Sequence, residues 1–78
     1  MARITVKLFG QFRLDAGWAA KELEADSVKR LFEMLMQGEK RIERKRAIVY
    51  VNKAKCSKMS FKLADGDEVW LLGAAYGG

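Results

Sequence analysis

The chain has 78 residues, of which 50% are hydrophobic and 32% are charged, and it carries a formal net charge of +5. With no histidine and a single cysteine, it cannot form a serine–histidine triad, a histidine-ligated zinc site or an internal disulfide. A chain this short seldom adds a ligand cleft of about 300 to 1,000 Å³ to its core, which disfavours a self-contained enzyme.

Two strands are predicted at the start of the chain. Residues Arg3 to Phe9 alternate between apolar and mostly polar side chains, which is the period of a half-buried strand. Gly10 offers a break after it. A second strand is predicted within Trp18 to Ala25, following turn candidates at Asp15 to Gly17 and completing a hairpin.

Ser27 is the predicted N-cap of an amphipathic helix, because its hydroxyl can accept a hydrogen bond from a free amide of the first turn. Asp26 beside it favours the positive end of the helix. The apolar residues follow at helical spacing: Val28, Leu31, Phe32 and Leu35. Gly38 lies where a helix commonly ends, and we expect residues Glu39 to Arg46 to form an exposed loop or a short second helix.

The remaining elements are strands. Residues Ala47 to Asn52 are rich in β-branched and aromatic side chains, which predicts a strand nearly buried on both sides. Phe61 and Leu63 fit a short strand or an extended segment. Residues Asp65 to Asp67 predict a tight turn with Gly66 at positive φ, leading into a last strand over Glu68 to Leu72.

This order of elements predicts an α+β domain with one helix packed across one face of a mixed sheet. If that helix covers Ile4 and Val69, the alternation of the strands places Phe9, Trp70 and Leu72 on the opposite face. Nothing in the chain remains to cover that face, so these three side chains are candidates for a protein interface. The alternative is that Trp70 folds over the sheet edge and Phe9 caps the core.

The last six residues, 73–78, have no obvious element to dock on, and we predict a domain over residues 1–72 followed by a flexible tail. Fully extended, the tail reaches about 20 Å. Gly77 and Gly78 lack β-carbons, so they can thread a narrow channel and leave the terminal carboxylate unhindered for attack on a nucleotide phosphate. The chain has no G-x-x-x-x-G-K loop, so activation requires a partner that uses ATP. The alternative is an ordinary frayed terminus.

The middle of the chain is basic. Between Lys40 and Lys62 lie nine basic residues against one acid, Glu43. Such a run can contact phosphates or an acidic partner, but most are solvated faces, and we do not expect nucleic acid as the partner.

Three further residues suggest chemistry that we do not assign. Cys56 is interpreted as a packing residue and not as the sulfur carrier. Asp65 and Asp67 resemble an acid pair, but the turn explains both, and calcium needs six or more oxygen ligands, so no metal site is expected.

The sequence also bears on where the protein resides. The lone thiol and the lack of an apolar leader after Met1 favour a reducing cytoplasm. No apolar run approaches the roughly 20 residues that span a bilayer, so no membrane partner is expected.

Taken together, several segments resemble the MoaD-type small subunit of molybdopterin synthase, a relative of the thiamin sulfur carrier ThiS and of ubiquitin. The resemblance covers nearly the whole chain. The segments that carry it are Val6 to Phe12, the helix with Val28 and Leu31, Val51-Asn52, Leu63 to Val69 and terminal Gly77-Gly78. It implies a β-grasp, ubiquitin-like fold with four to five strands and one main helix.

The resemblance implies a sulfur carrier that is not itself an enzyme and binds no cofactor. A ubiquitin-activating-type (MoeB-like) adenylyltransferase would use ATP to adenylylate Gly78, and a sulfur donor protein would convert it to a thiocarboxylate. The tail, with Gly77, would then enter a MoaE-like large subunit and donate sulfur to a pterin precursor, building the ligand of molybdenum or tungsten. The implied partner-binding residues are Phe9, Trp70, Leu72, Ala75 and Tyr76.

Other functions remain open at this point. The same carrier chemistry can serve thiamin or another thiolated product. An activated Gly78 can also form an isopeptide bond with a lysine, as in ubiquitin-like conjugation. The most distant alternative is a basic nucleic-acid-binding module that uses Lys40 to Lys62.

Overall fold

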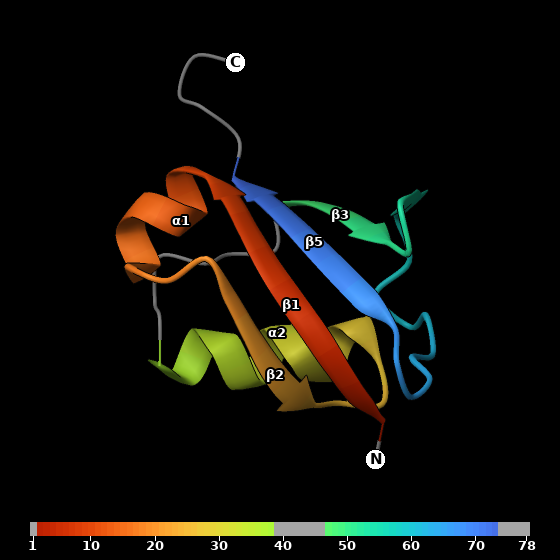
Figure 1. Ribbon diagram of the computed structural model, residues 1–78. Helices are drawn as coiled ribbons and strands as arrows, with labels where there is room; N and C mark the ends of the chain where they lie inside the picture. The colour runs from red at the N-terminus through yellow and green to blue at the C-terminus, as the bar shows by residue number, and fades with distance from the viewer. Residues whose placement is uncertain (1, 39–46, 74–78) are drawn as a thin grey trace.

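The computed structural model describes residues 2–38 and 47–73 of the chain. Figure 1 shows its helices and strands. In chain order they are β1 (Arg3–Gly10), α1 (Gln11–Ala16), β2 (Ala20–Glu24), α2 (Val28–Gly38), β3 (Ala47–Val51), β4 (Ala54–Cys56) and β5 (Glu68–Gly73). The predicted exposed segment Glu39 to Arg46 lies outside the described residues.

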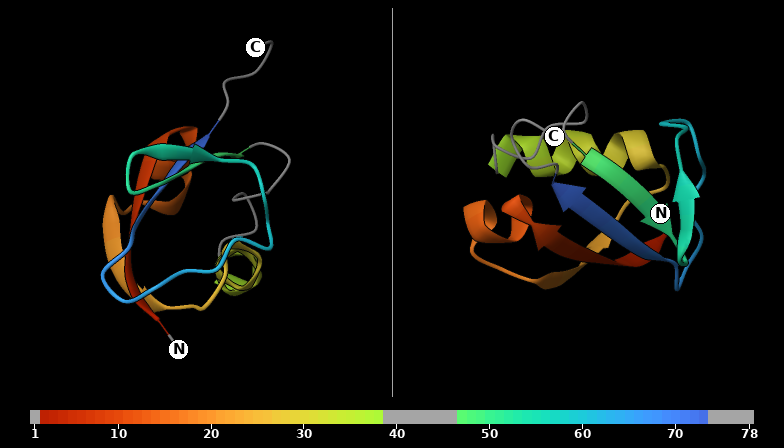
Figure 2. Two further views of the ribbon diagram at one scale, coloured as in Figure 1. Left: turned by 90° about the vertical axis from the view of Figure 1, so that its right-hand side faces the viewer. Right: turned by 90° about the horizontal axis from the view of Figure 1, so that it is seen from above.

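The strands form one mixed sheet in the order β2-β1-β5-β3-β4. β1 and β5 pair in parallel at the centre, and the other neighbours pair antiparallel. The sheet curls, and α2 lies across its concave face (Figure 2). The predicted α+β architecture, a β-grasp with one main helix, is therefore confirmed.

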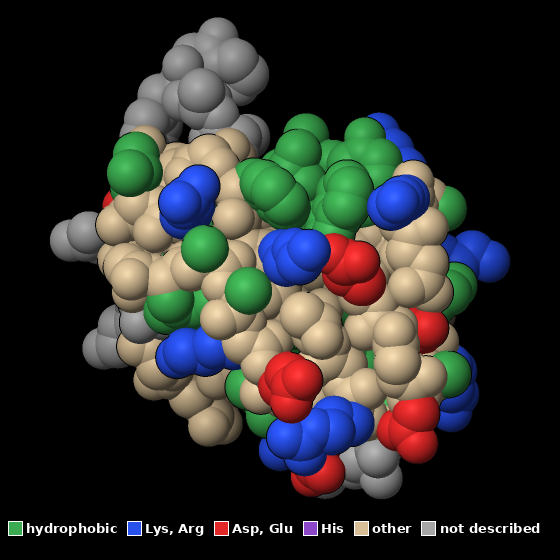
Figure 3. All heavy atoms as spheres, in the orientation of Figure 1, with side chains coloured by type: hydrophobic (Ala, Val, Ile, Leu, Met, Phe, Trp, Pro, Cys, Tyr) green, Lys and Arg blue, Asp and Glu red, His purple; other side chains and the backbone are tan. Residues whose placement is uncertain are grey.

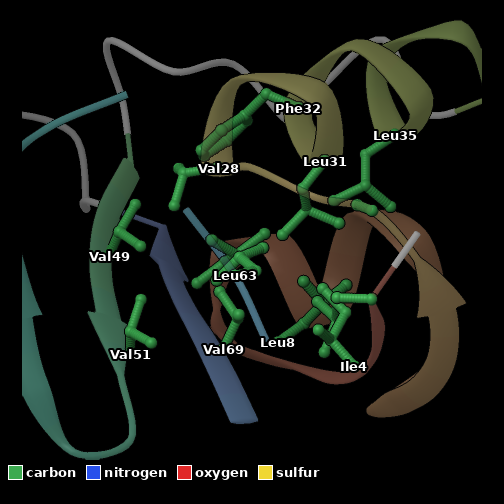
Figure 4. Close-up of a cluster of buried hydrophobic side chains, with 14 of the residues drawn as sticks. Ile4, Leu8, Val28, Leu31, Phe32, Leu35, Val49, Val51, Leu63 and Val69 are labelled. Atoms are coloured by element: carbon green, nitrogen blue, oxygen red, sulfur yellow. The ribbon is translucent and has the colours of Figure 1, made fainter. Parts of the chain in front are cut away.

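The core lies between α2 and the sheet, as the two periodicities predict. Figure 4 shows the helix residues pointing down onto the strands. The predicted residues are all buried: Ile4, Val6, Leu8, Val28, Leu31, Phe32, Leu35, Val69 and Leu71. Burying one large aliphatic or aromatic side chain contributes roughly 1.5 to 3 kcal/mol, so this layer supplies most of the drive for folding.

The start of α2 is also as predicted. The Oγ of Ser27 accepts a hydrogen bond from the backbone N–H of Arg30 at 3.1 Å, which satisfies one of the free amides of the first turn. Its backbone carbonyl accepts from Leu31 at 3.0 Å. Ser27 is therefore the N-cap of the helix.

The short helix α1 was not predicted, since the sequence indicated only a break and a turn between the first two strands. Gly10 turns the chain at a φ of +64°, and Phe12 in the first turn is fully buried. Ala16, one turn later, also packs on the core. Gly17 ends the helix in the left-handed conformation and donates its N–H to the carbonyl of Arg13 at 3.1 Å.

A short strand, β4, lies at Ala54–Cys56, where none was predicted. Of the two alternatives for Phe61 and Leu63, the extended segment is confirmed and the short strand is not. Asn52 and Lys53 both have positive φ, 51° and 71°, which makes a two-residue hairpin turn of the type that matches strand twist. Phe61 and Leu63 flank only an isolated bridge between Ser27 and Lys62, and their segment is extended without being a strand.

β3 is buried on one side only, contrary to prediction. Val49 and Val51 face the core, whereas Ile48 on the other face is 40% exposed. No other element of residues 2–38 and 47–73 covers that second face, so its side chains meet solvent.

β5 runs one residue further than predicted, through Gly73. The turn before it is as predicted: Gly66 has a φ of 89°, and Asp67 donates its N–H to the carbonyl of Ala64 at 3.1 Å. None of the helices in the described part of the chain is long and apolar enough to cross a membrane.

Candidate partner-docking face

The exposed face of the sheet carries the three side chains that alternation places there. In the parallel pair of central strands, Phe9 of β1 lies opposite Leu72 of β5, and Lys7 lies opposite Trp70. The predicted placement of Phe9, Trp70 and Leu72 on one face, away from α2, is therefore confirmed. In Figure 3 hydrophobic side chains gather on this face over β5 and β3, near the top of the view.

Aromatic contacts hold the centre of this face together. The rings of Phe9 and Trp70 have their centroids 5.4 Å apart at 61°, an edge-to-face arrangement. Tyr50 lies on the other side of Trp70 at 6.2 Å. Phe9 is 37% exposed, so it does not cap the core, and β5 is a central strand, so Trp70 does not fold over a sheet edge. The alternative considered from the sequence is thereby excluded.

Two members of the face were missed by sequence reasoning. Ile48 lies opposite Leu72 and Tyr50 lies opposite Trp70 in the antiparallel pair of β3 and β5. Their shared position could have been found from the alternation of the strand, because residues two apart, such as Ile48 and Tyr50, lie on one face. The prediction that this strand is buried on both sides left no exposed face to which they could be assigned. We call the five residues Phe9, Ile48, Tyr50, Trp70 and Leu72 the apolar face.

A charged pair borders the apolar face. The carboxylate Oε2 of Glu68 accepts a hydrogen bond from Nε1 of Trp70 at 2.8 Å. The same oxygen forms an ion pair with Nζ of Lys7 at 2.7 Å. The hydrogen bond from Lys7, and then that from Trp70, lower the pKa of Glu68. Glu68 thus fixes the orientation of the indole whose ring contacts Phe9.

The described part of the chain ends at Gly73, directly beside this face. Gly73 follows Leu72 and pairs with Gly10 at the end of β1. A β-carbon on Gly73 would stand 2.8 Å from the backbone nitrogen of Phe12, and one on Gly10 would stand 3.1 Å from the carbonyl oxygen of Gly73. Both glycines therefore allow a close approach of backbones at the ends of β1 and β5.

The remaining predicted site residues follow Gly73 in the sequence. Ala75, Tyr76, Gly77 and Gly78 are outside the described residues, and their roles stay predictions. Five residues, 74–78, follow Gly73, and a segment of that length spans at most about 18 Å when extended.

The carboxylates of the Asp65 to Asp67 turn are used by the fold. Asp65 accepts from the backbone N–H of Arg3 at 2.8 Å, and Asp67 accepts from Ala64 at 2.8 Å and from Nδ2 of Asn52 at 2.9 Å. Within residues 2–38 and 47–73 no group of histidine, cysteine or acidic side chains is arranged to hold a metal ion.

Cys56 is partly buried, with its Sγ 3.5 Å from the carbonyl oxygen of Lys58. It also packs against the hydrophobic core. This placement agrees with its interpretation as a packing residue.

Comparison with known proteins connects this geometry to a family. A family model described as the ThiS family matches residues 6–78, a range that includes Gly77 and Gly78. No curated protein matches the chain.

Several solved structures share the fold. The putative molybdopterin converting factor subunit 1 of Pyrococcus furiosus is 23% identical, with a TM-score of 0.80 over 96% of this chain and 100% of that one. Small archaeal modifier protein 1 of Methanosarcina acetivorans is 22% identical, with a TM-score of 0.83 over 100% and 98%. A chain in the complex of molybdopterin-converting factor subunits 1 and 2 from Helicobacter pylori is 22% identical, with a TM-score of 0.74 over 97% and 99%. At these identities the likeness shows the fold alone.

Proposed function

The chain belongs to the ThiS family of ubiquitin-like sulfur carriers, and from this membership we propose that Gly78 carries sulfur as a thiocarboxylate for the synthesis of molybdopterin. The observation that supports the proposal is the position of Gly73, the last described residue. It follows Leu72, a member of the apolar face, and ends β5 beside Gly10 of β1. A partner that covers this face is thereby positioned to receive the C-terminus.

The chemistry begins at the carboxylate of Gly78. One of its oxygens attacks the α-phosphorus of ATP held by a MoeB-like adenylyltransferase, which forms the acyl adenylate and expels pyrophosphate. The terminal sulfur of a persulfide on the donor protein then attacks the acyl carbon and displaces AMP, which leaves an acyl disulfide. A thiol attacks the donor's own sulfur in that disulfide, so that the S–S bond breaks, the thiocarboxylate leaves and a new disulfide remains on the donor. The leaving group is needed because a free carboxylate is a poor acylating group. The chain supplies the reacting carboxylate, and the partners supply the catalytic side chains and the ATP.

The apolar face is the proposed docking surface for the later step, in which the thiocarboxylate delivers its sulfur to the acceptor. Aromatic and large aliphatic side chains are common anchors of protein interfaces, and here five of them form a continuous surface bordered by Lys7 and Glu68. We propose that a MoaE-like large subunit covers this face while the tail, with Ala75 and Tyr76, enters its active site. The structural neighbour from Helicobacter pylori is described as a protein–protein complex of subunits 1 and 2 of molybdopterin-converting factor.

A second function uses the same activated end. The likeness to small archaeal modifier protein 1 favours attack on the Gly78 adenylate by a lysine, which would join the chain to another protein. Sulfur transfer to thiamin or another thiolated product differs only in the acceptor. These alternatives share the activation step and separate at the last one.

Intact-mass measurement tests the activation step. The full chain is incubated with a MoeB-like adenylyltransferase, ATP and a sulfur donor, and we expect the mass gain of one oxygen replaced by one sulfur. A matched chain that ends at Tyr76 should remain unmodified. If the full chain is also unmodified with an adenylyltransferase that is active on another carrier, the proposal is contradicted.

The acceptor is tested by adding, in separate reactions, a MoaE-like subunit with its pterin precursor and a mixture of lysine-bearing proteins. Loss of the added sulfur only in the first reaction supports molybdopterin synthesis. A covalent conjugate in the second supports the modifier function instead.

A further inference from the structure

β4 forms one edge of the sheet. It pairs with β3 through three residues, and in the part of the chain that the structure describes no strand lies on its other side. The β4 strand follows the two-residue turn at Asn52 and Lys53, so Val51 and Ala54 close the hairpin. In an antiparallel ladder the hydrogen-bonded pairs alternate, and the peptide groups of Lys55 therefore face away from β3. An outward-facing N–H and C=O can pair with an added strand.

A hollow of about 260 Å³ lies beside this edge. Its apolar wall comes from Val51, Ala54, Cys56 and Phe61, and the ring of Phe61 is itself 41% exposed. The volume is below the range of about 300 to 1,000 Å³ that is usual for small-molecule sites. It is suited to one large apolar side chain.

The surroundings of the hollow are basic. Lys55 and Lys58 line it, and Lys53 and Lys62 are close along the chain. No aspartate or glutamate occurs between Ala47 and Ala64. The ion pairs among the described residues involve the basic side chains of Arg3, Lys7 and Arg30. Neither Lys55 nor Lys58 takes part in one of them. Uncompensated positive charge of this kind attracts a negatively charged partner.

We propose that the β4 edge and its hollow bind an extended acidic peptide segment. The segment adds a strand beside Lys55, places one large apolar side chain in the hollow against Phe61, and sets its carboxylates against Lys55 and Lys58. This site is separate from the apolar face, and its existence does not depend on the chemistry of Gly78. It gives a function to the part of the basic segment that lies after residue 46.

The charge on the edge also excludes other occupants. Lysine on an edge strand opposes pairing with neutral or basic strands, which protects a protein from edge-to-edge aggregation. A second copy of this chain would bring its own Lys55 and Lys58 to the same edge and be repelled. The same lysines become an attraction only when the incoming strand is acidic.

NMR titration of the full ¹⁵N-labelled chain tests the proposal. The probe is the peptide acetyl-Glu-Asp-Val-Leu-Val-Asp-Glu-amide, and two matched peptides replace its acids by glutamine or its apolar residues by serine. We expect saturable shifts of the amides of residues 54–56 and Phe61 with the first peptide. Each matched peptide should bind at least about tenfold more weakly, because it lacks either the charge or the anchor.

Matched variants of the chain complete the test. Lys55→Gln/Lys58→Gln should weaken binding about fivefold or more, whereas Arg13→Gln/Lys29→Gln, with the same change in net charge on α1 and α2, should change it less than twofold. Phe61→Ala should weaken binding, and Leu14→Ala, which removes an exposed side chain from α1, should not. The dispersion of each spectrum shows that the variant is folded.

Several results would overturn the proposal. These are the absence of saturable shifts at millimolar peptide, shifts centred on the apolar face, and an equal loss of binding in the two double variants. Two further results would also overturn it. Shifts of residues 54–56 that depend on protein concentration in the absence of peptide would indicate that a second copy of the chain binds the edge. Displacement of the peptide by a single-stranded RNA oligonucleotide that shifts the same amides more strongly would indicate a nucleic-acid site.

Discussion

Gly73 approaches Phe12 so closely that a β-carbon on Gly73 would stand 2.8 Å from the Phe12 backbone nitrogen and 3.0 Å from its ring. The atoms in the way are backbone and a fully buried ring, so neither can move cheaply. This contact joins the last residue of β5 to the first turn of α1. It therefore fixes the position of Gly73, the last described residue, against α1.

Gly73→Ala should therefore destabilise the domain by about 1 to 3 kcal/mol, the usual cost of overpacking. The matched control is Gly38→Ala, where a β-carbon meets nothing within 4 Å and alanine favours a helix. Urea unfolding followed by circular dichroism measures both. Equal stability of the two variants would show that the junction around Gly73 yields more easily than its contacts indicate.

The apolar face makes a prediction about docking. Leu72→Asp should weaken the affinity for the large subunit at least about tenfold, because it buries a charge at the centre of an apolar interface. Ile48→Asp should have a similar effect, although sequence reasoning did not find this residue. Leu14→Asp is the control, since Leu14 is 75% exposed but lies on α1. Titration calorimetry with the large subunit gives the affinities. An equal loss of affinity in all three variants would contradict docking through the apolar face.

Glu68, which borders the apolar face, makes the stability of the domain depend on pH in the acidic range. Its pKa is lowered from 4.5, first by the hydrogen bond from Lys7 and then by that from Trp70. A lowered pKa in the folded state means that the ionised form contributes stability above the unfolded pKa, and that this contribution is lost as the pH falls through the folded value. The difference in unfolding free energy between the wild type and Glu68→Gln should thus be constant at neutral pH and shrink below about pH 4.5.

The indole signal of Trp70 gives a second readout of the same contact. Its Nε1–H resonance should shift in Glu68→Gln and, in the wild type, on acidification. Glu22→Gln removes the exposed pair with Arg3 at 3.0 Å on the β1–β2 side of the sheet and should leave this resonance unchanged. Trp18→Phe identifies which of the two indole signals belongs to Trp70. An unshifted Trp70 signal in Glu68→Gln would mean that the carboxylate does not orient the ring.

The parts of the fold that could be predicted are those set by local periodicity. Alternation in β1 and β5 placed Phe9, Trp70 and Leu72 on one face, and the spacing of Val28 and Leu31 placed α2 on the other. Neither inference needs contacts from distant parts of the chain. The role of Gly77 and Gly78 was suggested by their lack of side chains at the end of the sequence and by the family resemblance, and it stays a prediction because both residues lie outside the described residues.

The missed parts depend on contacts between distant residues. α1 is stabilised by the burial of Phe12 beside Gly73, which no local pattern reveals. β4 depends on positive φ at Asn52 and Lys53, a pair that is not the Asn-Gly sequence typical of such turns. The face of Ile48 follows only from the register between β3 and β5.

Asn52 connects the β3–β4 turn to the start of β5, and its replacement separates two contributions to stability. Its Nδ2 donates to Asp67 at 2.9 Å, and its Oδ1 accepts from the backbone N–H of Glu68 at 2.9 Å. Its φ is 51°, a conformation that asparagine and glycine adopt at low cost and alanine does not. Asn52→Ala should lose both contributions and cost about 2 to 4 kcal/mol.

Asn52→Gly should cost about 1 to 2 kcal/mol less than Asn52→Ala, because glycine keeps the left-handed conformation and loses only the side-chain hydrogen bonds. Lys53→Ala is the matched control. It keeps a β-carbon at a φ of 71° and removes no hydrogen bond of the described structure, so its unfolding free energy should stay within about 0.5 kcal/mol of the wild type. If glycine and alanine at position 52 destabilise equally, the hydrogen bonds to Asp67 and Glu68 account for the whole effect and the backbone conformation carries no cost.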